Sequence, residues 1–102
     1  MNHTVNNISI VCYDITSNKL RCKIDKAMKD FGTRLQFSVF LCRLDPQGIN
    51  RCRDALKKVL ELYHIEKEST DSLIIFERLH PESADCLLGS RIDQEAPRFE
   101  IF

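Results

Sequence analysis

Apolar positions in the first third of the chain follow a strand pattern and then a helix pattern. Residues 8–13 (ISIVCY) form a short, nearly continuous apolar run that ends at Asp14, which is typical of a strand inside a sheet. After Thr16 and Ser17, which are favourable N-cap residues, apolar residues recur at steps of three and four and predict a helix that stops near Gly32. The apolar face of this helix consists of Leu20, Ile24, Ala27, Met28 and Phe31.

Segment 35–44 (LQFSVFLCRL) is strand-like, but apolar residues occupy both of its faces. No turn residue interrupts it, so it fits either one long strand or two strands separated by a bulge. Asp45 and Pro46 then predict the start of a second helix, with the aspartate as its cap and the proline in its first turn. The apolar face of the second helix consists of Ile49, Cys52, Leu56, Val59, Leu60 and Tyr63.

The last part of the chain combines one strand pattern with a polar stretch. Residues 72–76 (SLIIF) predict a further buried strand. Residues 80–97 are polar and contain two prolines and one glycine, which indicates a loop or extension. The end of the chain, 98–102 (RFEIF), again has the composition of a strand.

The order of these elements predicts the architecture. Strands that alternate with helices of this length favour a sandwich in which the helices cover one face of a sheet. If segment 35–44 counts as two strands, the order is the βαββαβ of a ferredoxin-like α+β fold. We therefore expect a core domain at residues 1–79 and a C-terminal extension at residues 80–102.

Length and composition are those of one soluble domain. The chain has 102 residues, 43% of them hydrophobic, which is too apolar for a disordered segment. No run approaches the roughly 18 apolar residues of a membrane span, and the first residues lack the features of a secretory signal. The five cysteines are odd in number and form no CxxC pair, so we expect reduced thiols in a cytoplasmic protein rather than a zinc site.

Charge is distributed unevenly along the chain. Residues 1–58 contain eleven Lys and Arg against five Asp and Glu, a net charge of +6, whereas residues 59–102 carry a net charge of −6. This asymmetry indicates a basic face for an anionic partner. Lys19, Lys23 and Lys26 lie at helical spacing, an arrangement that binds phosphate backbones with little sequence specificity. A solvated helix surface is the alternative explanation.

Asp14 is the most informative single residue, because it places a carboxylate at the carboxyl end of an apolar strand. Hard cations such as Mg²⁺ take oxygen ligands and keep several waters. One carboxylate per chain is a poor site, but a twofold dimer could bring two together. The alternative is a cap or turn residue. The histidines, serines and glycines form no zinc, serine-hydrolase or phosphate-loop pattern.

Three segments carry a resemblance to a known family. The strand end YDI at 13–15 is followed, after the basic helix, by GTRLQFSVF at 32–40, and later by DSLIIF at 71–76. Together they resemble the small CRISPR-associated endoribonuclease family, the non-integrase partner subunit of the spacer-acquisition complex. The similarity covers residues 8–79 well and residues 80–102 only loosely.

The resemblance implies a ferredoxin-like homodimer whose C-terminal strand pairs with the partner's sheet, a role that the composition of 98–102 suits. It implies a metal-dependent endonuclease, with Mg²⁺ as cofactor, that acts on single-stranded RNA or duplex DNA. It also implies a scaffold that bridges copies of the CRISPR spacer integrase subunit. By this resemblance Asp14 is the metal ligand, and Asp14 and Phe40 are the catalytic residues. The candidate nucleic-acid-binding residues are Lys19, Arg21, Lys23 and Arg34, of which Lys23 stands where many relatives have arginine.

Two other functions fit the same residues. The chain could be a stand-alone toxin-type endoribonuclease of the same fold that acts on messenger RNA. It could also be a ferredoxin-like regulatory or ligand-binding module without nuclease activity. A neighbouring integrase gene with a repeat array favours the CRISPR role, an antitoxin gene favours the toxin, and failure to bind any nucleic acid favours the module.

Overall fold

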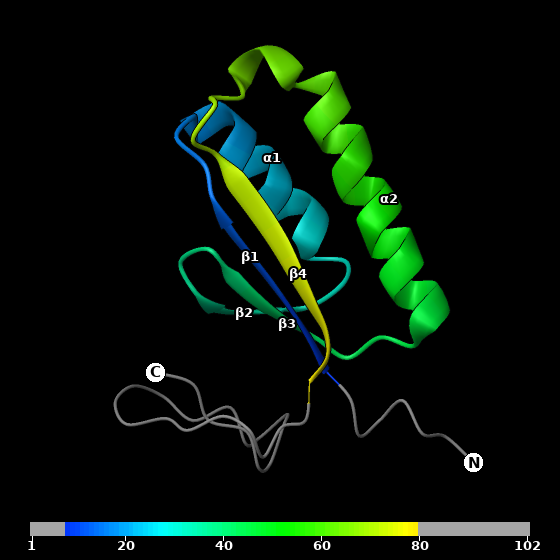
Figure 1. The fold of residues 1–102 in the computed structure, drawn as a ribbon. Helices are drawn as coiled ribbons and strands as arrows, with labels where there is room; N and C mark the ends of the chain where they lie inside the picture. Colours follow the sequence, from blue (N-terminus) through cyan, green and yellow to red (C-terminus); the bar gives the residue numbers. More distant parts are fainter. Residues whose placement is uncertain (1–7, 80–102) are drawn as a thin grey trace, which may run out of the picture.

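The computed structural model of the chain describes residues 8–79, apart from the side chain of Arg78. The predicted extension at 80–102, with its strand at 98–102, lies outside the described residues. Within them the elements follow the order βαββαβ (Figure 1). They are β1 (Ile8–Asp14), α1 (Asn18–Met28), β2 (Thr33–Gln36), β3 (Val39–Cys42), α2 (Pro46–Leu62), the 3₁₀ helix η2 (His64–Glu66) and β4 (Ser72–Leu79).

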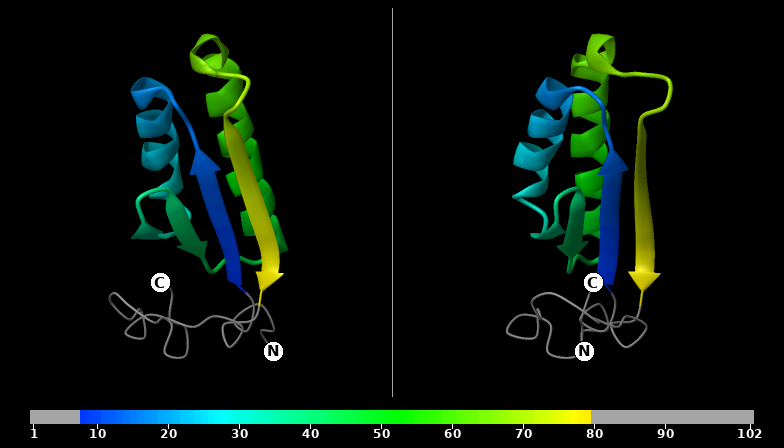
Figure 2. Two further views of the ribbon diagram at one scale, coloured as in Figure 1. Left: turned by 60° about the vertical axis from the view of Figure 1, so that its left-hand side comes forward. Right: turned by 90° about the vertical axis from the view of Figure 1, so that its left-hand side faces the viewer.

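The four strands form one antiparallel sheet in the order β2-β3-β1-β4, and Figure 2 shows both helices on the same face of it. This arrangement confirms the ferredoxin-like α+β fold. Segment 35–44 does not form one strand: β2 begins earlier, at Thr33, and Phe37 and Ser38 make the turn into β3. No helix among residues 8–79 has the length and apolar character needed to cross a membrane.

Both helices begin where the sequence predicts, because a side-chain oxygen accepts a free backbone N–H at each start. The Ser17 hydroxyl accepts a hydrogen bond from Leu20 N at 3.1 Å and caps α1. The Asp45 carboxylate accepts one from Gly48 N at 2.7 Å, and Pro46 occupies the first position of α2. Each cap is typically worth about 1 kcal/mol.

The main core lies between the helices and the sheet. β1 contributes Val11 and Tyr13, and β3 contributes Phe40, whose ring stacks on Tyr13 with centroids 6.3 Å apart. The helix residues that the periodicity predicts are buried here, namely Leu20, Ile24, Met28, Cys52 and Leu56. All four cysteines in the described part of the chain are free thiols, as expected from their spacing.

The strand predicted at 72–76 is confirmed, but the prediction that it is buried is wrong for one of its two faces. β4 runs to Leu79 and lies at one edge of the sheet, next to β1 alone. Leu73 and Ile75 pack toward the helices, whereas Ile74 and Phe76 remain 47% and 46% exposed on the other face. The reason is that successive strand residues point to opposite faces, and the helices cover only one of them.

Glycine is needed at position 32 because of close packing against β3, and not for the predicted helix stop. α1 already ends at Met28, and the Gly32 N–H donates to the Met28 carbonyl at 3.0 Å. A Cβ at Gly32 would lie 2.4 Å from the Leu41 carbonyl oxygen and 2.7 Å from the Cys42 sulfur. The position therefore requires glycine because β3 approaches the backbone closely.

Candidate functional site

The carboxyl end of β1 is where some, but not all, of the predicted site residues lie near one another. The Tyr13 N–H donates to the Ser38 carbonyl at 3.1 Å, which holds the β2–β3 turn against the end of β1. Arg21 of α1 donates from Nη1 to the Ile15 carbonyl at 2.9 Å, one residue beyond Asp14. The fold thus brings together the end of β1, the first turns of α1 and the β2–β3 turn.

Asp14 is exposed, and within residues 8–79 its carboxylate makes no hydrogen bond or ion pair. Another carboxylate holds the following loop. Asp71 accepts hydrogen bonds from Glu68 N at 2.8 Å and Thr16 N at 2.9 Å. These two bonds hold the pKa of Asp71 below its usual range, and the bond from Glu68 has the larger effect. Because Ser17 and Asp71 satisfy the loop, the cap or turn role considered for Asp14 has no support.

The donor set at this end fits only part of a metal site. Among residues 8–79, no three His, Cys, Asp or Glu side chains cluster as metal ligands. Asp14 offers one exposed carboxylate, which suits a hard cation that retains most of its waters. A complete Mg²⁺ site would therefore need a second ligand from outside this part of one chain, such as Asp14 of a second copy.

Arg21 is held in place by its own contacts. Besides the Ile15 carbonyl, its guanidinium donates to the Asn18 side chain. Its central carbon lies 5.4 Å from the centroid of the Phe37 ring, within the range of a cation–π contact. Phe37 lies in the β2–β3 turn and is 70% exposed. The pair forms a basic and aromatic surface near the carboxyl end of β1.

Arg34 is engaged on three sides. It forms an ion pair with Asp25 at 3.2 Å, donates to the Phe37 carbonyl, and lies 5.0 Å from the centroid of the Phe40 ring. Its side chain is 37% exposed. These contacts make Arg34 a residue that fixes the β2–β3 turn, and they leave only part of its guanidinium open to an anion.

Asp25 is a site residue that the sequence analysis missed. Its carboxylate accepts a hydrogen bond from the Tyr13 hydroxyl with one oxygen and pairs with Arg34 through the other. Burial, followed by the Asp25 hydrogen bond, raises the pKa of Tyr13. No local pattern marks Asp25, because its partners come from β1 and β2.

Phe40, Lys19 and Lys23 do not lie at a common site with Asp14. Phe40 is 1% exposed and lies in the core under Arg34, so it supports that residue and has no access to a substrate. Lys23 lies over the ring of Tyr63, 5.4 Å from its centroid, at the contact between the two helices. Lys19 is exposed on α1. Arg34 lies over Phe40 on the helix side of the sheet, whereas Asp14 follows Tyr13 on β1 and faces the open side, so the structure does not gather the predicted site residues into one cluster.

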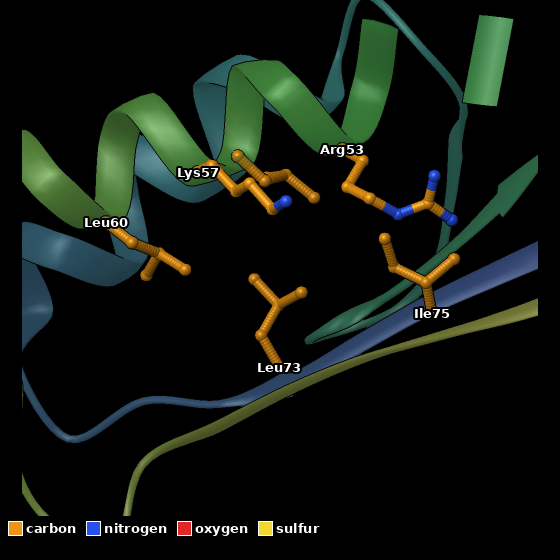
Figure 3. A pocket seen from close by; sticks show the side chains of 6 residues that line it. Arg53, Lys57, Leu60, Leu73 and Ile75 are labelled. Carbon is orange, nitrogen blue, oxygen red and sulfur yellow. The ribbon is translucent and has the colours of Figure 1, made fainter. Parts of the chain in front are cut away.

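A cavity of about 340 Å³ lies between α2 and β4 (Figure 3). It is largely apolar, and none of the predicted site residues lines it. Its lining consists of Arg53, Leu56, Lys57, Leu60, Leu73 and Ile75. Arg53 is paired with Glu77 of β4. Since no nucleophile or carboxylate is among its lining residues, the cavity is a place for apolar side chains rather than a reaction site.

Residues 7–82 match the model of a family described as CRISPR associated protein Cas2. A protein from Rhodospirillum rubrum named CRISPR-associated endoribonuclease Cas2 4 is 32% identical over 77 residues, which are 76% of this chain and 54% of that protein. The chain thus spans about half the length of that relative. CRISPR-associated endoribonuclease Cas2 3 from Synechocystis is 32% identical over 88 residues, covering 86% of this chain and 85% of that protein.

Solved structures agree with the fold. A hypothetical protein TT1823 from Thermus thermophilus superposes with a TM-score of 0.64 at 28% identity, covering 82% of this chain and 92% of that one. Streptococcus pyogenes Cas2 superposes with a TM-score of 0.58 at 23% identity, covering 93% of this chain and 98% of that one. At 23% identity, the similarity to Streptococcus pyogenes Cas2 supports only the arrangement of strands and helices.

Proposed function

Because the chain belongs to the CRISPR-associated Cas2 family, we propose that it is a nucleic-acid-binding protein of CRISPR adaptation that also cleaves phosphodiester bonds in a metal-dependent reaction. The observation that carries the proposal is the exposed Asp14 carboxylate at the end of β1, which has no partner within residues 8–79. The relatives named endoribonuclease support activity on RNA.

The residues at this end of the sheet have separate tasks in the proposed reaction. Asp14 would hold Mg²⁺, which when bound supplies Lewis-acid stabilisation of the phosphodiester transition state. Arg21 would present its remaining N–H groups to a phosphate of the bound nucleic acid, while its bonds to Ile15 and Asn18 limit its motion. Arg34 keeps the β2–β3 turn in place through the Phe37 carbonyl.

A homodimer would complete the metal site by adding a second Asp14. Its support is the edge strand β4, whose outer side pairs with no other strand among residues 8–79. The apolar cavity of Figure 3 lies beside that edge, and the segment 98–102 of a second copy has apolar side chains at alternate positions to fill it. Deleting residues 97–102 should lower the dimer mass measured by light scattering at low micromolar concentration, and an unchanged mass would reject this pairing.

The nuclease proposal is tested by Asp14→Asn, which keeps the shape of the side chain and removes its charge. The variant should lose Mg²⁺-dependent cleavage of single-stranded RNA and duplex DNA while its circular dichroism and mass stay unchanged. Asp54→Asn, at an exposed position on α2, is the matched control and should cleave at the parent rate. Cleavage by repurified Asp14→Asn at the parent rate, or equal parent activity in excess chelator, would contradict the mechanism.

The scaffold role is a separate part of the proposal. It rests on family membership and on the basic first half of the chain, which would contact duplex phosphates without reading their sequence. Co-purification with the spacer integrase subunit and a short DNA duplex tests it. Asp14→Asn should still co-purify, since phosphate contacts and a subunit interface do not need the metal. Failure of the parent protein to co-purify would leave only the nuclease function.

A further inference from the structure

Phe37 is an exposed aromatic ring in a place where the core gives it no role. It is 70% exposed, whereas the other ring of the same segment, Phe40, is 1% exposed. It occupies the two-residue turn between β2 and β3, a position that polar residues normally fill.

The backbone of the turn that carries the ring is held in place by hydrogen bonds. The carbonyl of Phe37 accepts a hydrogen bond from Arg34, and the carbonyl of the next residue, Ser38, accepts one from Tyr13 N at 3.1 Å. Arg34 is itself anchored by Asp25 at 3.2 Å. The turn is thereby tied to both its own strand and the end of β1, so the backbone that carries the ring is fixed without a ligand.

The position of Arg21 indicates which kind of ligand the Phe37 ring can bind. Its guanidinium lies 5.4 Å from the ring centroid, and its two other hydrogen bonds keep it there. The ring nevertheless remains 70% exposed, so most of its surface is open. A planar aromatic ligand can stack on this open surface, while the adjacent cation attracts a negatively charged group on the same ligand.

We propose that Phe37 and Arg21 form a stacking site for one unpaired nucleobase of a single-stranded nucleic acid, with the guanidinium against the adjoining phosphate. The inference rests on the proposed function and specifies its substrate as single-stranded at the point of contact. Paired bases inside a duplex do not expose their faces, so duplex binding would not use this site. A second copy is a less suitable cover, because the proposed dimer edge is β4, at the opposite side of the sheet from β2.

The test compares Phe37→Leu with Phe37→Tyr. Leucine keeps an apolar side chain but has no aromatic face, whereas tyrosine keeps the ring. The probes are a single-stranded RNA of twelve uridines and a blunt RNA duplex of twelve pairs, both titrated in chelator to prevent cleavage. Phe37→Leu should weaken binding of the single strand by about 5- to 150-fold, since base stacking on one aromatic side chain contributes that much. Phe37→Tyr should bind it like the parent, and all three proteins should bind the duplex equally.

Tryptophan fluorescence can test directly whether a nucleobase stacks at position 37. The chain contains no tryptophan, so Phe37→Trp introduces a single reporter at the site. The uridine strand should quench its emission, and the duplex should not. Leu62→Trp is the control, because Leu62 is similarly exposed, at 77%, but lies at the end of α2. Quenching of both reporters to the same extent would count against a specific site.

The outcomes separate this inference from the proposed function. Full single-strand affinity in Phe37→Leu rejects the stacking site and leaves the proposed function intact. An equal loss for single strand and duplex rejects it in favour of a change in the turn. A lower mass of Phe37→Leu by light scattering assigns the ring to an interface between copies. If the parent binds neither probe, the proposed function and the stacking site both fail.

Discussion

Replacing Asp25 with alanine should destabilise the protein mainly through the tyrosine hydroxyl that it leaves behind. Asp25 accepts a hydrogen bond from Tyr13, which is 5% exposed, and forms an ion pair with Arg34 at 3.2 Å. Without the carboxylate, the buried hydroxyl has no replacement acceptor among its known contacts. Arg34, by contrast, is partly exposed and can turn to water.

The magnitude follows from these two contacts. A hydrogen bond from a buried hydroxyl to a charged acceptor contributes about 1.5–3 kcal/mol. The partly exposed ion pair contributes about 0–1 kcal/mol, because water screens it. Alanine is a better helix former than aspartate, which offsets about 0.5 kcal/mol inside α1. We therefore expect Asp25→Ala to lower the free energy of unfolding by about 1–3.5 kcal/mol.

A double-mutant cycle isolates the hydroxyl–carboxylate contact. Tyr13→Phe is made in the parent and in Asp25→Ala, and the free energy of unfolding is measured by urea titration at neutral pH. The helix-propensity difference appears in both arms and cancels. Tyr13→Phe should cost about 1–3 kcal/mol in the parent and should be neutral or stabilising in Asp25→Ala, where it removes a hydroxyl without a partner.

Additive costs would refute this reasoning. If Tyr13→Phe destabilises both backgrounds equally, within the roughly 0.5 kcal/mol expected of independent sites, then Asp25 does not stabilise the hydroxyl. Asp25→Asn is the informative control, since its amide oxygen can still accept from Tyr13 but its neutral side chain no longer pairs with Arg34. It should recover most of the lost stability.

Two further predictions concern pH and backbone packing. Burial, and then the hydrogen bond to Asp25, raise the pKa of Tyr13 in the native protein. Between pH 10 and 11 the unfolded chain therefore binds fewer protons than the native one, and the free energy of unfolding falls as pH rises. Urea titrations from pH 8 to 11 should show a shallower fall for Tyr13→Phe than for the parent, and parallel curves would contradict this. Gly32→Ala should cost about 1–3 kcal/mol by the same titration, because its Cβ would meet the Leu41 carbonyl at 2.4 Å. Gly48→Ala in α2 is the control: its Cβ would lie 3.0 Å from the Leu44 Cβ and 3.1 Å from the Asp45 Oδ1, and the gain in helix propensity offsets this tightness. It should cost clearly less than Gly32→Ala, and an equal cost would mean that the approach of β3 is not the cause.

The sequence determined the elements whose signals are local. The continuous apolar run at 8–13 and the steps of three and four in both helices are repeated patterns, so the strand, the helices and their buried faces could be predicted. Ser17 and Asp45 were predictable caps because each bonds a backbone group only three residues away. Asp14 was also predictable as a candidate, since it ends the first strand and stands in the family's YDI segment.

Only the tertiary structure decided what depends on partners far apart in the chain. The break between β2 and β3 has no glycine, proline or asparagine to mark it, and the turn is held by Tyr13 and Arg34 instead. The exposure of Ile74 was hidden because an edge strand and a central strand share the same composition. Asp25 gains its role only when the fold brings β1 and β2 to α1, since hydrogen bonds and ion pairs act over a few ångströms of space and not over sequence separation.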